Sequence, residues 1–357
     1  MKVPLEKNQY IKKIEVNEDG LDIQFEDKKK VAITFISVND RYWPYLKQVI
    51  EDCKHNFLPH HNVDYFVWSD IPEKGSPEYQ AIKGTEWWTK EKLVETVDYL
   101  RDTKGIEIFE TEAIEWPAPT LMRYHLFLQQ EEKLKEYDYV FYLDADMRVV
   151  DKISDELFNE GLLSAEHPMY SLRREYIPPY EPNPDSTAYI PRPGRVIDDN
   201  GKPRFKPYYY AGGFQGGKTD EWIRAMQVMK DNIDKDFNNN YVAIWNDESH
   251  WNKYLSTYEG ELIVLPPSYI YPDSLIKEYY EPIWGKKYEP KIITITKPFS
   301  LSKQGAEHLN EFLGRPNEPV FKCPTCNDSF QAQGHTIKRV ITCPGTGKPH
   351  ELEMAKS

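Results

Sequence analysis

Residues 139–146 read Tyr-Val-Phe-Tyr-Leu-Asp-Ala-Asp, an apolar and aromatic run followed at once by two acids. A short continuous run of this kind is typical of a strand buried on both faces of a sheet. Ligands of open α/β sheets bind at the carboxyl ends of the strands, where Asp144 and Asp146 follow this run. The sequence therefore predicts a buried strand over 139–143 that ends at a ligand site.

Apolar runs on the N-terminal side of this stretch predict an α/β fold. Residues 31–37 and 63–68 are typical of buried strands, and apolar residues at helical spacing fill 42–57 between them. A strand, a helix and a second strand in succession form a βαβ unit, which implies a parallel sheet. Further helices are expected over 90–100, 120–134, 221–233 and 241–254, and further strands over 106–109 and 262–265.

The composition limits the class of protein. With 39% hydrophobic residues among 357, the chain can form one large domain of roughly 250–300 residues. Its net charge of −13 argues against a nucleic-acid partner, which would need a basic face. No apolar run approaches the roughly 20 residues that span a bilayer, and residues 1–9 hold no signal-peptide core. We expect a soluble cytoplasmic protein, without a membrane anchor and without nucleic acid.

Two small units are expected beside the large domain. Apolar residues alternate over 11–26 around Asp19-Gly20, a pattern typical of a hairpin. The C-terminal segment differs from the rest because it holds three of the four cysteines. The predicted organisation is an N-terminal hairpin extension over 1–30, the main domain over 31–300, a linker over 301–319 and a zinc-binding module over 320–357.

The prediction of zinc depends on the spacing of its ligands. Cys323-Pro-Thr-Cys326 is followed by Cys343 and then by His350. A Cys-x2-Cys pair with a distal Cys and His suits a tetrahedral structural Zn²⁺ site. His335 competes with His350 as the fourth ligand, and the alternative is a tail with three unpaired thiols. We predict a zinc-ribbon-like appendage.

Two further stretches hold residue types found at ligand sites. Residues 211–217, Ala-Gly-Gly-Phe-Gln-Gly-Gly, let the backbone approach a ligand closely, and the alternative is a flexible turn. Asp247 and Glu248 are adjacent, so on a helix their side chains point about 100° apart and can serve different functions. Trp245 and Trp251 flank them, which predicts a partly desolvated and therefore more reactive pair of carboxylates.

These stretches together resemble the retaining α-1,3-glycosyltransferases that make the A and B blood-group antigens and the α-galactosyl epitope, known as glycosyltransferase family 6. Five motifs follow in the family's order within about residues 31–275, which makes a chance resemblance very unlikely. They are Phe-Tyr-Leu-Asp-Ala-Asp-Met at 141–147, His-Pro-Met-Tyr at 167–170, the loop at 180–191, Tyr-Tyr-Ala-Gly-Gly-Phe-Gln-Gly-Gly at 209–217 and Trp-Asn-Asp-Glu-Ser-His-Trp-Asn-Lys-Tyr at 245–254.

The resemblance implies a Rossmann-like GT-A nucleotide-sugar transferase fold, a UDP-sugar donor, a glycan acceptor and Mn²⁺ or Mg²⁺. Asp144 and Asp146 match the metal and diphosphate ligands, and Glu248 matches the catalytic carboxylate. Arg123 corresponds to an arginine near the donor sugar, its alternative being an exposed helix charge. The family's uracil-stacking aromatic is not reproduced at Ser37, where Phe35 or Tyr42 is expected to substitute. Further implied contacts are Ala211, Gly212, Gly213 and Asp247 to the donor, and His167 and Trp245 to the acceptor.

The implied reaction transfers a galactose-type sugar with retention, in an α linkage, to a glycan hydroxyl, with α-1,3 as the expected linkage. Glu248 would either attack covalently or stabilise positive charge while the acceptor enters on the donor face. The positions matching Ala211 and Gly213 select between galactose and N-acetylgalactosamine in the family, and small residues at both favour UDP-N-acetylgalactosamine. The alternatives are a UDP-sugar hydrolase and a catalytically inactive carbohydrate-binding protein on the same fold.

Overall fold

The computed structural model describes residues 11–17, 20–25, 27–85, 87–113, 117–168, 170, 178–191, 209–272 and 288–295, and short strands beyond residue 319. In chain order the elements up to residue 295 are β1 (Ile11–Asn17), β2 (Gly20–Phe25), β3 (Lys30–Ser37), α1 (Trp43–Asn56), β4 (Asn62–Ser69), α2 (Pro77–Ala81), α3 (Lys90–Asp102), β5 (Ile106–Glu110), α4 (Ala118–Leu128), α5 (Glu131–Leu134), β6 (Tyr139–Leu143), β7 (Met147–Val149), β8 (Leu162–Glu166), β9 (Tyr210–Lys218), α6 (Thr219–Asn238), α7 (Asn246–Thr257), β10 (Leu262–Leu265), β11 (Tyr271–Pro272) and β12 (Ile292–Thr294).

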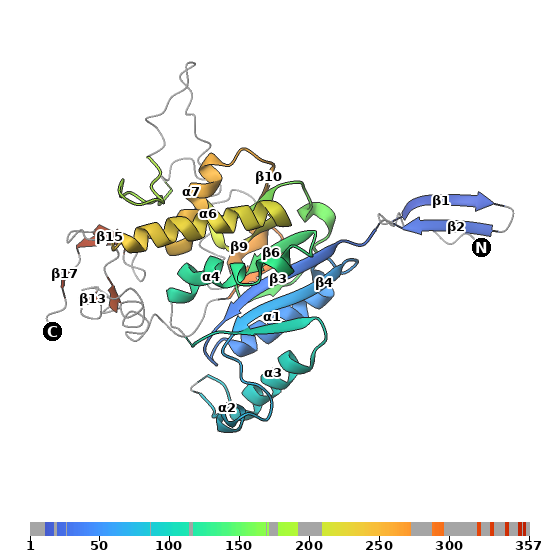
Figure 1. The fold of residues 1–357 in the computed structure, drawn as a ribbon, viewed down its shortest axis with the longest axis horizontal. Helices are drawn as coiled ribbons and strands as arrows, with labels where there is room; N and C mark the ends of the chain where they lie inside the picture. Colours follow the sequence, from blue (N-terminus) through green and yellow to red (C-terminus); the bar gives the residue numbers. More distant parts are fainter. Residues whose placement is uncertain are drawn as a thin grey trace, which may run out of the picture.

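The centre of the molecule is a seven-stranded sheet with the order β10-β8-β9-β6-β3-β4-β5 (Figure 1). Strands β6, β3, β4 and β5 run parallel, as the βαβ pattern predicts. Strand β9 runs antiparallel to both β6 and β8, so the sheet is mixed rather than parallel. The α/β class is confirmed, and the large mixed sheet is consistent with a GT-A-like glycosyltransferase.

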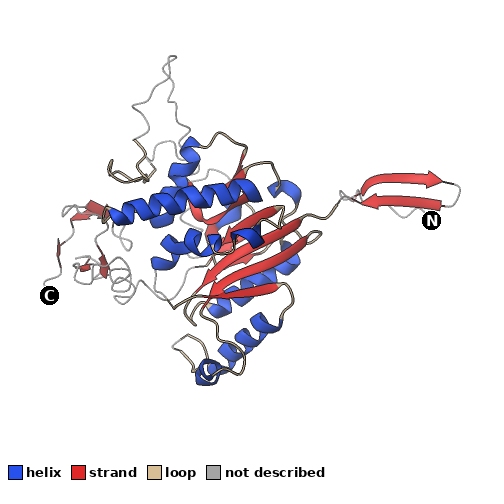
Figure 2. Ribbon diagram, viewed as in Figure 1, coloured by secondary structure: helices blue, strands red, loops and turns tan. Residues whose placement is uncertain are grey.

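Helices cover both faces of this sheet (Figure 2). Alternate residues of β3 face opposite sides, because side chains of a strand point up and down in turn. Val31 and Ile33 belong to the apolar cluster that includes α1 and α3, whereas Ala32 belongs to the cluster that includes α4, α6 and α7. These strand residues are fully buried, which explains why the strand reads as a continuous apolar run.

Two helices differ from the sequence prediction. The helix expected over 120–134 is divided into α4 and α5, because the N–H groups of Gln129 and Gln130 donate to carbonyls three residues back and tighten the last turn. The helix expected over 241–254 begins only at Asn246. The Tyr241 hydroxyl and the Ile244 N–H both donate to the buried Glu181 carboxylate, at 2.6 and 2.7 Å, and the segment they anchor is not helical.

A small sheet holds the acidic turn in place. Its order is β11-β12-β7, and β7 begins directly after Asp146. The Ile295 N–H donates to the Asp146 carbonyl at 3.0 Å and extends this pairing by one residue. The two acids therefore lie on a turn fixed by β6 on one side and by the small sheet on the other.

The two terminal units are described only in part. Strands β1 and β2 pair antiparallel from Ile11↔Phe25 to Asn17↔Gly20, so the predicted hairpin is confirmed. Beyond residue 319, β13 (Val320–Lys322) pairs with β14 (Ser329–Gln331) and β17 (Glu353–Met354), and β15 (Val340–Thr342) pairs with β16 (Pro349–Glu351). None of the described helices is long and apolar enough to cross a lipid bilayer.

Candidate active site

The acidic turn opens into a pocket at the carboxyl end of the sheet. Asp144 and Asp146 line this pocket together with Arg123 from α4 and with Arg41 and Tyr42, which precede α1. The Asp144 side chain is 35% exposed, whereas Asp146 is only 6% exposed. Two aspartates and two arginines thus line one cavity, a combination suited to a ligand that carries both phosphates and a bound cation.

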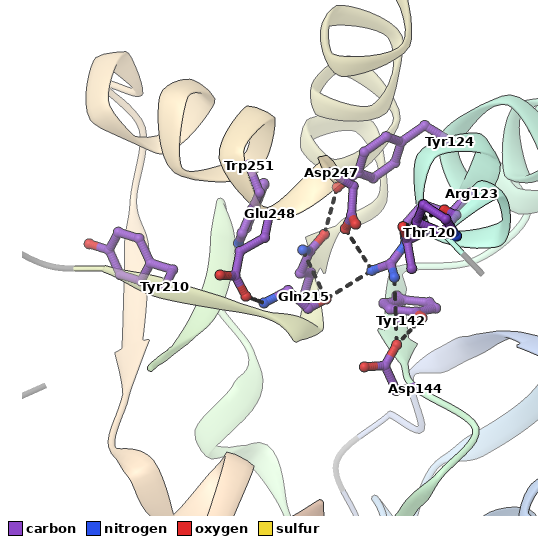
Figure 3. A network of polar contacts seen from close by, with 12 residues as sticks. Thr120, Arg123, Tyr124, Tyr142, Asp144, Tyr210, Gln215, Asp247, Glu248 and Trp251 are labelled. Atoms are coloured by element: carbon purple, nitrogen blue, oxygen red, sulfur yellow. Dashed lines mark hydrogen bonds and ion pairs between the residues drawn. The ribbon is translucent and has the colours of Figure 1, made fainter. Parts of the chain in front are cut away.

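Arg123 connects the acidic turn to the glycine-rich strand (Figure 3). Its side chain is almost fully buried, with Nη2 3.6 Å from an Asp144 oxygen and Nη1 3.0 Å from an Asp247 oxygen. Nη1 also donates to the Gly212 carbonyl at 2.9 Å. A buried cation is tolerated only when it is paired and hydrogen-bonded, and these contacts supply both conditions. The alternative of an exposed helix charge at Arg123 is wrong.

Tyr142 completes the surroundings of this arginine. The Arg123 guanidinium lies over the Tyr142 ring, 4.1 Å from its centroid, and the Tyr142 hydroxyl donates to the Asp144 carboxylate (Figure 3). Stacking on one face and hydrogen bonds at the edge fix the plane of the guanidinium. Arg123 therefore presents a fixed orientation toward the pocket.

Glu248 lies on the other side of Gly212. Its Oε2 accepts a hydrogen bond from the Gly212 N–H at 2.8 Å (Figure 3). Burial raises the pKa of Glu248 to about 7, although the Tyr209 hydroxyl and the Gly212 N–H lower it, and Asp247 and Asp144 raise it further. Glu248 is therefore a poorly solvated carboxyl group, and its charged form is stabilised by positive charge on a ligand.

Asp247 differs from its neighbour because it faces Arg123. Burial raises the pKa of Asp247 to about 6, while the Arg123 charge lowers it and Asp144 raises it. Both acids belong to the first turn of α7, where the helix dipole favours negative charge. The two side chains have different partners, as their adjacency on a helix predicts.

An aromatic group lies beside Glu248. The ring of Tyr209 is 5.7 Å from that of His167 and 5.2 Å from that of Tyr170, between centroids. Burial lowers the pKa of His167 to about 4, so the imidazole is neutral at physiological pH. Trp245 is 47% exposed at the start of α7. His167 thus lies near Glu248, because Tyr209 contacts both residues. Trp245 precedes Glu248 by three residues in the chain and lies on the surface.

The two residues expected to contact uracil are placed differently. Tyr42 lines the pocket. Phe35 does not: its side chain is fully buried in the core with Val31 and Ile33, on the face of β3 that packs against α1. Phe35 is therefore a core residue, and of the two expected residues only Tyr42 is available to a base in this pocket.

The glycine-rich stretch is a central strand, so the alternative of a flexible turn is wrong. Ala211 is 3% exposed and belongs to the core. A methyl group added at Gly213 would lie 2.5 Å from Met147 Cε and 2.7 Å from Asp144 Oδ2. The ends of the Asp144 and Met147 side chains therefore lie beside Gly213, and both must shift before a larger group can occupy that space.

The acidic turn provides two carboxylates for a divalent cation, with no third ligand of the same kind nearby among the described residues. In the part of the chain that the structure describes, no group of three or more His, Cys, Asp or Glu residues surrounds a common point. Cations such as Mg²⁺ are usually held by one or two carboxylates together with substrate phosphates and water. Asp144 and Asp146 provide the two carboxylates at the edge of a pocket that also holds Arg123. This donor set suits an ion shared with a diphosphate.

Several site residues were not singled out from the sequence. Polar side chains at Tyr124, Tyr142 and Gln215 are buried in the network around Arg123, and Arg41 lines the pocket. Gln215 carried a usable signal, because it is the one long polar residue in the run from Ala211 to Gly217. The predicted zinc ligands Cys323, Cys326 and Cys343 lie outside the described residues, as does the side chain of His350.

Comparison with known proteins agrees with this geometry. The chain is 29% identical over 262 residues to histo-blood group ABO system transferase 1 of Rattus norvegicus, covering 73% of this chain and 66% of that protein. It is 26% identical over 242 residues to the O-antigen biosynthesis glycosyltransferase WbnI of Escherichia coli, covering 68% and 84%. It is 26% identical over 244 residues to globoside alpha-1,3-N-acetylgalactosaminyltransferase 1 of Gallus gallus, covering 68% and 62%.

The matched region thus spans about two thirds of the rat and chicken proteins, and more of the bacterial one. The sequence profile of glycosyltransferase family 6 matches residues 93–280, just over half of the 357-residue chain. This range includes the acidic turn, the glycine-rich strand and α7, which are the elements that form the network around Arg123. The protein therefore belongs to glycosyltransferase family 6.

Proposed function

We propose that this protein is a retaining glycosyltransferase that moves N-acetylgalactosamine, or galactose, from a UDP-sugar to a hydroxyl group of a glycan in an α linkage, α-1,3 being the expected position. The observation that carries the proposal is the network through Arg123 and Gly212, which joins Asp144 to Glu248. It supports a donor whose diphosphate lies at the acidic turn and whose sugar lies toward α7.

The diphosphate end of the donor is assigned to the pocket of Asp144, Asp146, Arg123 and Tyr42. Asp144 and Asp146 would hold Mn²⁺ or Mg²⁺, which when bound stabilises the negative charge of the departing UDP. Arg123 adds a fixed positive charge on the same side, since its guanidinium is held by Tyr142 and Asp247. Tyr42 is assigned to uracil.

Glu248 is assigned the negative charge on the opposite face of the sugar. As the bond from C1 to UDP breaks, positive charge develops on the ring, and a carboxylate nearby stabilises it. Asp247 is assigned to hydroxyl groups of the donor sugar and to the orientation of Arg123. His167 and Trp245 are assigned to the acceptor. Neutral imidazole and exposed indole groups suit the hydroxyls and the apolar face of a sugar.

The preference between the two donor sugars is proposed from the named activities of the relatives and from the small side chain at Ala211. Several relatives are named as N-acetylgalactosaminyltransferases, including those of Gallus gallus and Homo sapiens. Ala211 keeps the small side chain that favours an acetamido group at C2. Burying one methyl group contributes about 0.8 kcal/mol, and a hydrogen bond to the acetamido group adds about 0.5–1.5 kcal/mol. The preference for UDP-N-acetylgalactosamine is therefore expected to be modest, on the order of 10-fold and at most about 200-fold.

Release of UDP from both donors, with and without a panel of glycans, tests the function. We expect acceptor-dependent release in the presence of Mn²⁺, faster with UDP-N-acetylgalactosamine, and a product with an α-anomeric proton by NMR. Release that is equally fast without any glycan would support the hydrolase alternative. No release with any donor would support the inactive binding protein. A clear preference for UDP-galactose would show that residues other than Ala211 select the sugar.

The strands beyond residue 319 are compatible with the proposed zinc module. The segment 323–328 joins the paired strands β13 and β14, and it holds Cys323 and Cys326. The segment 343–348 joins β15 and β16, and it begins with Cys343. A Cys-x2-Cys pair with a distal Cys and His suits a structural zinc site of the zinc-ribbon kind. We propose that these cysteines and His350 bind one structural Zn²⁺.

Elemental analysis of the purified protein tests the zinc module. We expect about one tightly bound zinc per chain, and loss of that zinc in a protein that ends at Pro319. Cys323→Ser together with Cys326→Ser should have the same effect, whereas Cys53→Ser should not, because Cys53 is buried in the core of the main domain. Equal zinc content in the full-length and shortened proteins would contradict the assignment.

A further inference from the structure

Gln215 is a fully buried polar residue in the middle of β9, and the roles assigned above do not use it. It lies between β6 and β8, pairing with Tyr142 and Ser164. A buried amide costs about 1–3 kcal/mol when its hydrogen bonds are not made, and an apolar side chain of similar size would avoid that cost. The partners of this amide therefore indicate what it does.

The two ends of the amide have different partners (Figure 3). Gln215 Oε1 accepts a hydrogen bond from the Tyr124 hydroxyl at 3.0 Å, and Nε2 donates to the Gly212 carbonyl at 3.0 Å. Because a carbonyl oxygen only accepts, the nitrogen must face Gly212, and the orientation of the amide is determined. Tyr124 is itself fully buried in α4. Gln215 thus ties the backbone at Gly212 to a rigid helix.

Gly212 is the point at which such a restraint matters. Its N–H donates to Glu248, and its carbonyl accepts from both Gln215 and Arg123. These bonds fix the peptide planes on both sides of an α-carbon that has no side chain to restrain it. A methyl group at Gly212 would lie 3.3 Å from Glu248 Cβ and 3.5 Å from Asp247 Oδ2, so a larger residue would crowd both acids.

The two donors to the Gly212 carbonyl are not equivalent. Arg123 also faces Asp247 and Asp144, and it lines the pocket assigned to the diphosphate. An incoming anion competes for its N–H groups. Both hydrogen bonds described for Gln215 end inside the fold, at Gly212 and Tyr124. Gln215 can therefore hold the carbonyl whether or not a donor is bound.

We infer that Gln215 is a positioning residue for sugar transfer: it holds the Gly212 backbone so that the Gly212 N–H keeps the Glu248 carboxylate directed at the donor sugar. The inference rests on the proposed function, because it assigns Glu248 to the transition state. Tyr124 acts one step further away, by fixing the amide of Gln215. Small displacements of a catalytic group lower the chemical rate without weakening substrate binding.

The test compares Gln215→Met with a matched variant in the same sheet. Methionine keeps the unbranched shape but neither hydrogen bond. We expect kcat for sugar transfer to fall by roughly 10-fold to 100-fold, while KM for the UDP-sugar and the affinity for UDP stay within about twofold. The control is Thr34→Val, because the buried Thr34 hydroxyl donates to the Phe141 carbonyl at 3.1 Å and not to Gly212, Arg123 or Glu248. It should lose stability and keep kcat.

The variant Tyr124→Phe gives a second measurement. It removes the anchor of the amide and keeps the bond from Gln215 to Gly212, so we expect a smaller loss of kcat, on the order of several-fold, again with an unchanged KM. If Gln215→Met does not fold, an unchanged kcat in Tyr124→Phe overturns the inference.

The outcome separates the inference from the proposed function. If the parent protein is active and Gln215→Met has the same kcat as Thr34→Val, the inference is wrong and the proposed function still stands. A loss that falls on KM rather than kcat would also overturn it, since that result places Gln215 in donor binding. A parent protein that transfers no sugar from any donor would overturn the proposed function and this inference with it.

Discussion

Glu248→Gln is expected to lower kcat by roughly 10²–10³, because it removes one negative charge beside the developing positive charge of the sugar. Glutamine keeps the shape of the side chain, and its amide oxygen can still accept from the Gly212 N–H, which is 2.8 Å from Oε2 in the parent. The affinity for the UDP-sugar should change little. Steady-state kinetics of both proteins with the same donor and acceptor measure the effect. A variant within a few-fold of the parent would show that Glu248 has another role.

The pH dependence gives an independent check on Glu248. Burial raises the pKa of Glu248 from 4.5 to about 7, and the reaction needs the charged form. Activity of the parent should therefore rise as the pH passes through about 7, and the variant should lack this dependence. Glu132→Gln is a suitable control, because the Glu132 side chain is 89% exposed on α5.

The raised pKa of Glu248 also predicts how the stability of the folded protein changes with pH. Between pH 4.5 and about 7 the folded protein keeps a proton on Glu248 that the unfolded chain has lost, so the contribution of Glu248 to stability falls as the pH rises through this range. Glu248→Gln removes this loss. The variant should be more stable than the parent above pH 7, by up to about 3 kcal/mol, and equally stable near pH 4. Thermal unfolding at both pH values tests this, and equal stability above pH 7 would contradict the raised pKa.

Asp144→Asn and Asp146→Asn are each expected to remove most of the activity, on the order of 10²–10³ in kcat/KM. Each substitution replaces a charged ligand by a weak neutral one, so the clamp on the departing diphosphate is weakened. The concentration of Mn²⁺ needed for half-maximal activity should rise in both variants. Excess chelator should abolish the activity of the parent, and added Mn²⁺ should restore it.

Two controls separate metal binding from other effects of these substitutions. Asp151→Asn changes an exposed acid just after β7 and should leave the Mn²⁺ requirement unchanged. Calorimetry with Mn²⁺ and UDP together, without a sugar donor, should show weaker binding to both variants than to the parent. Full activity of the parent in excess chelator would contradict the assignment of a metal to this turn.

The sequence by itself predicted the parallel strands β3, β4, β5 and β6, the acidic turn and the family, but not β8 or β9. The runs at 31–37 and 139–143 predicted buried strands because residues covered on both faces must be apolar throughout. Asp144 and Asp146 follow such a strand directly, so chain order alone places them at its carboxyl end. Local signals of this kind need no knowledge of distant contacts.

Only the tertiary structure decided how the site residues meet. Arg123, Gly212 and Glu248 come from three elements far apart in the chain, and their hydrogen bonds exist because α4 and α7 pack on the same face of the sheet. The segment just before α7 is bonded to the buried Glu181, a partner about 60 residues away that the sequence does not indicate. Phe35 was expected to contact uracil because of its position in the chain, but its side chain lies in the core. Side chains of a strand alternate between its two faces, and Phe35 lies on the face that packs against α1. The sequence shows which residue types are present, whereas long-range packing determines which of them share a pocket.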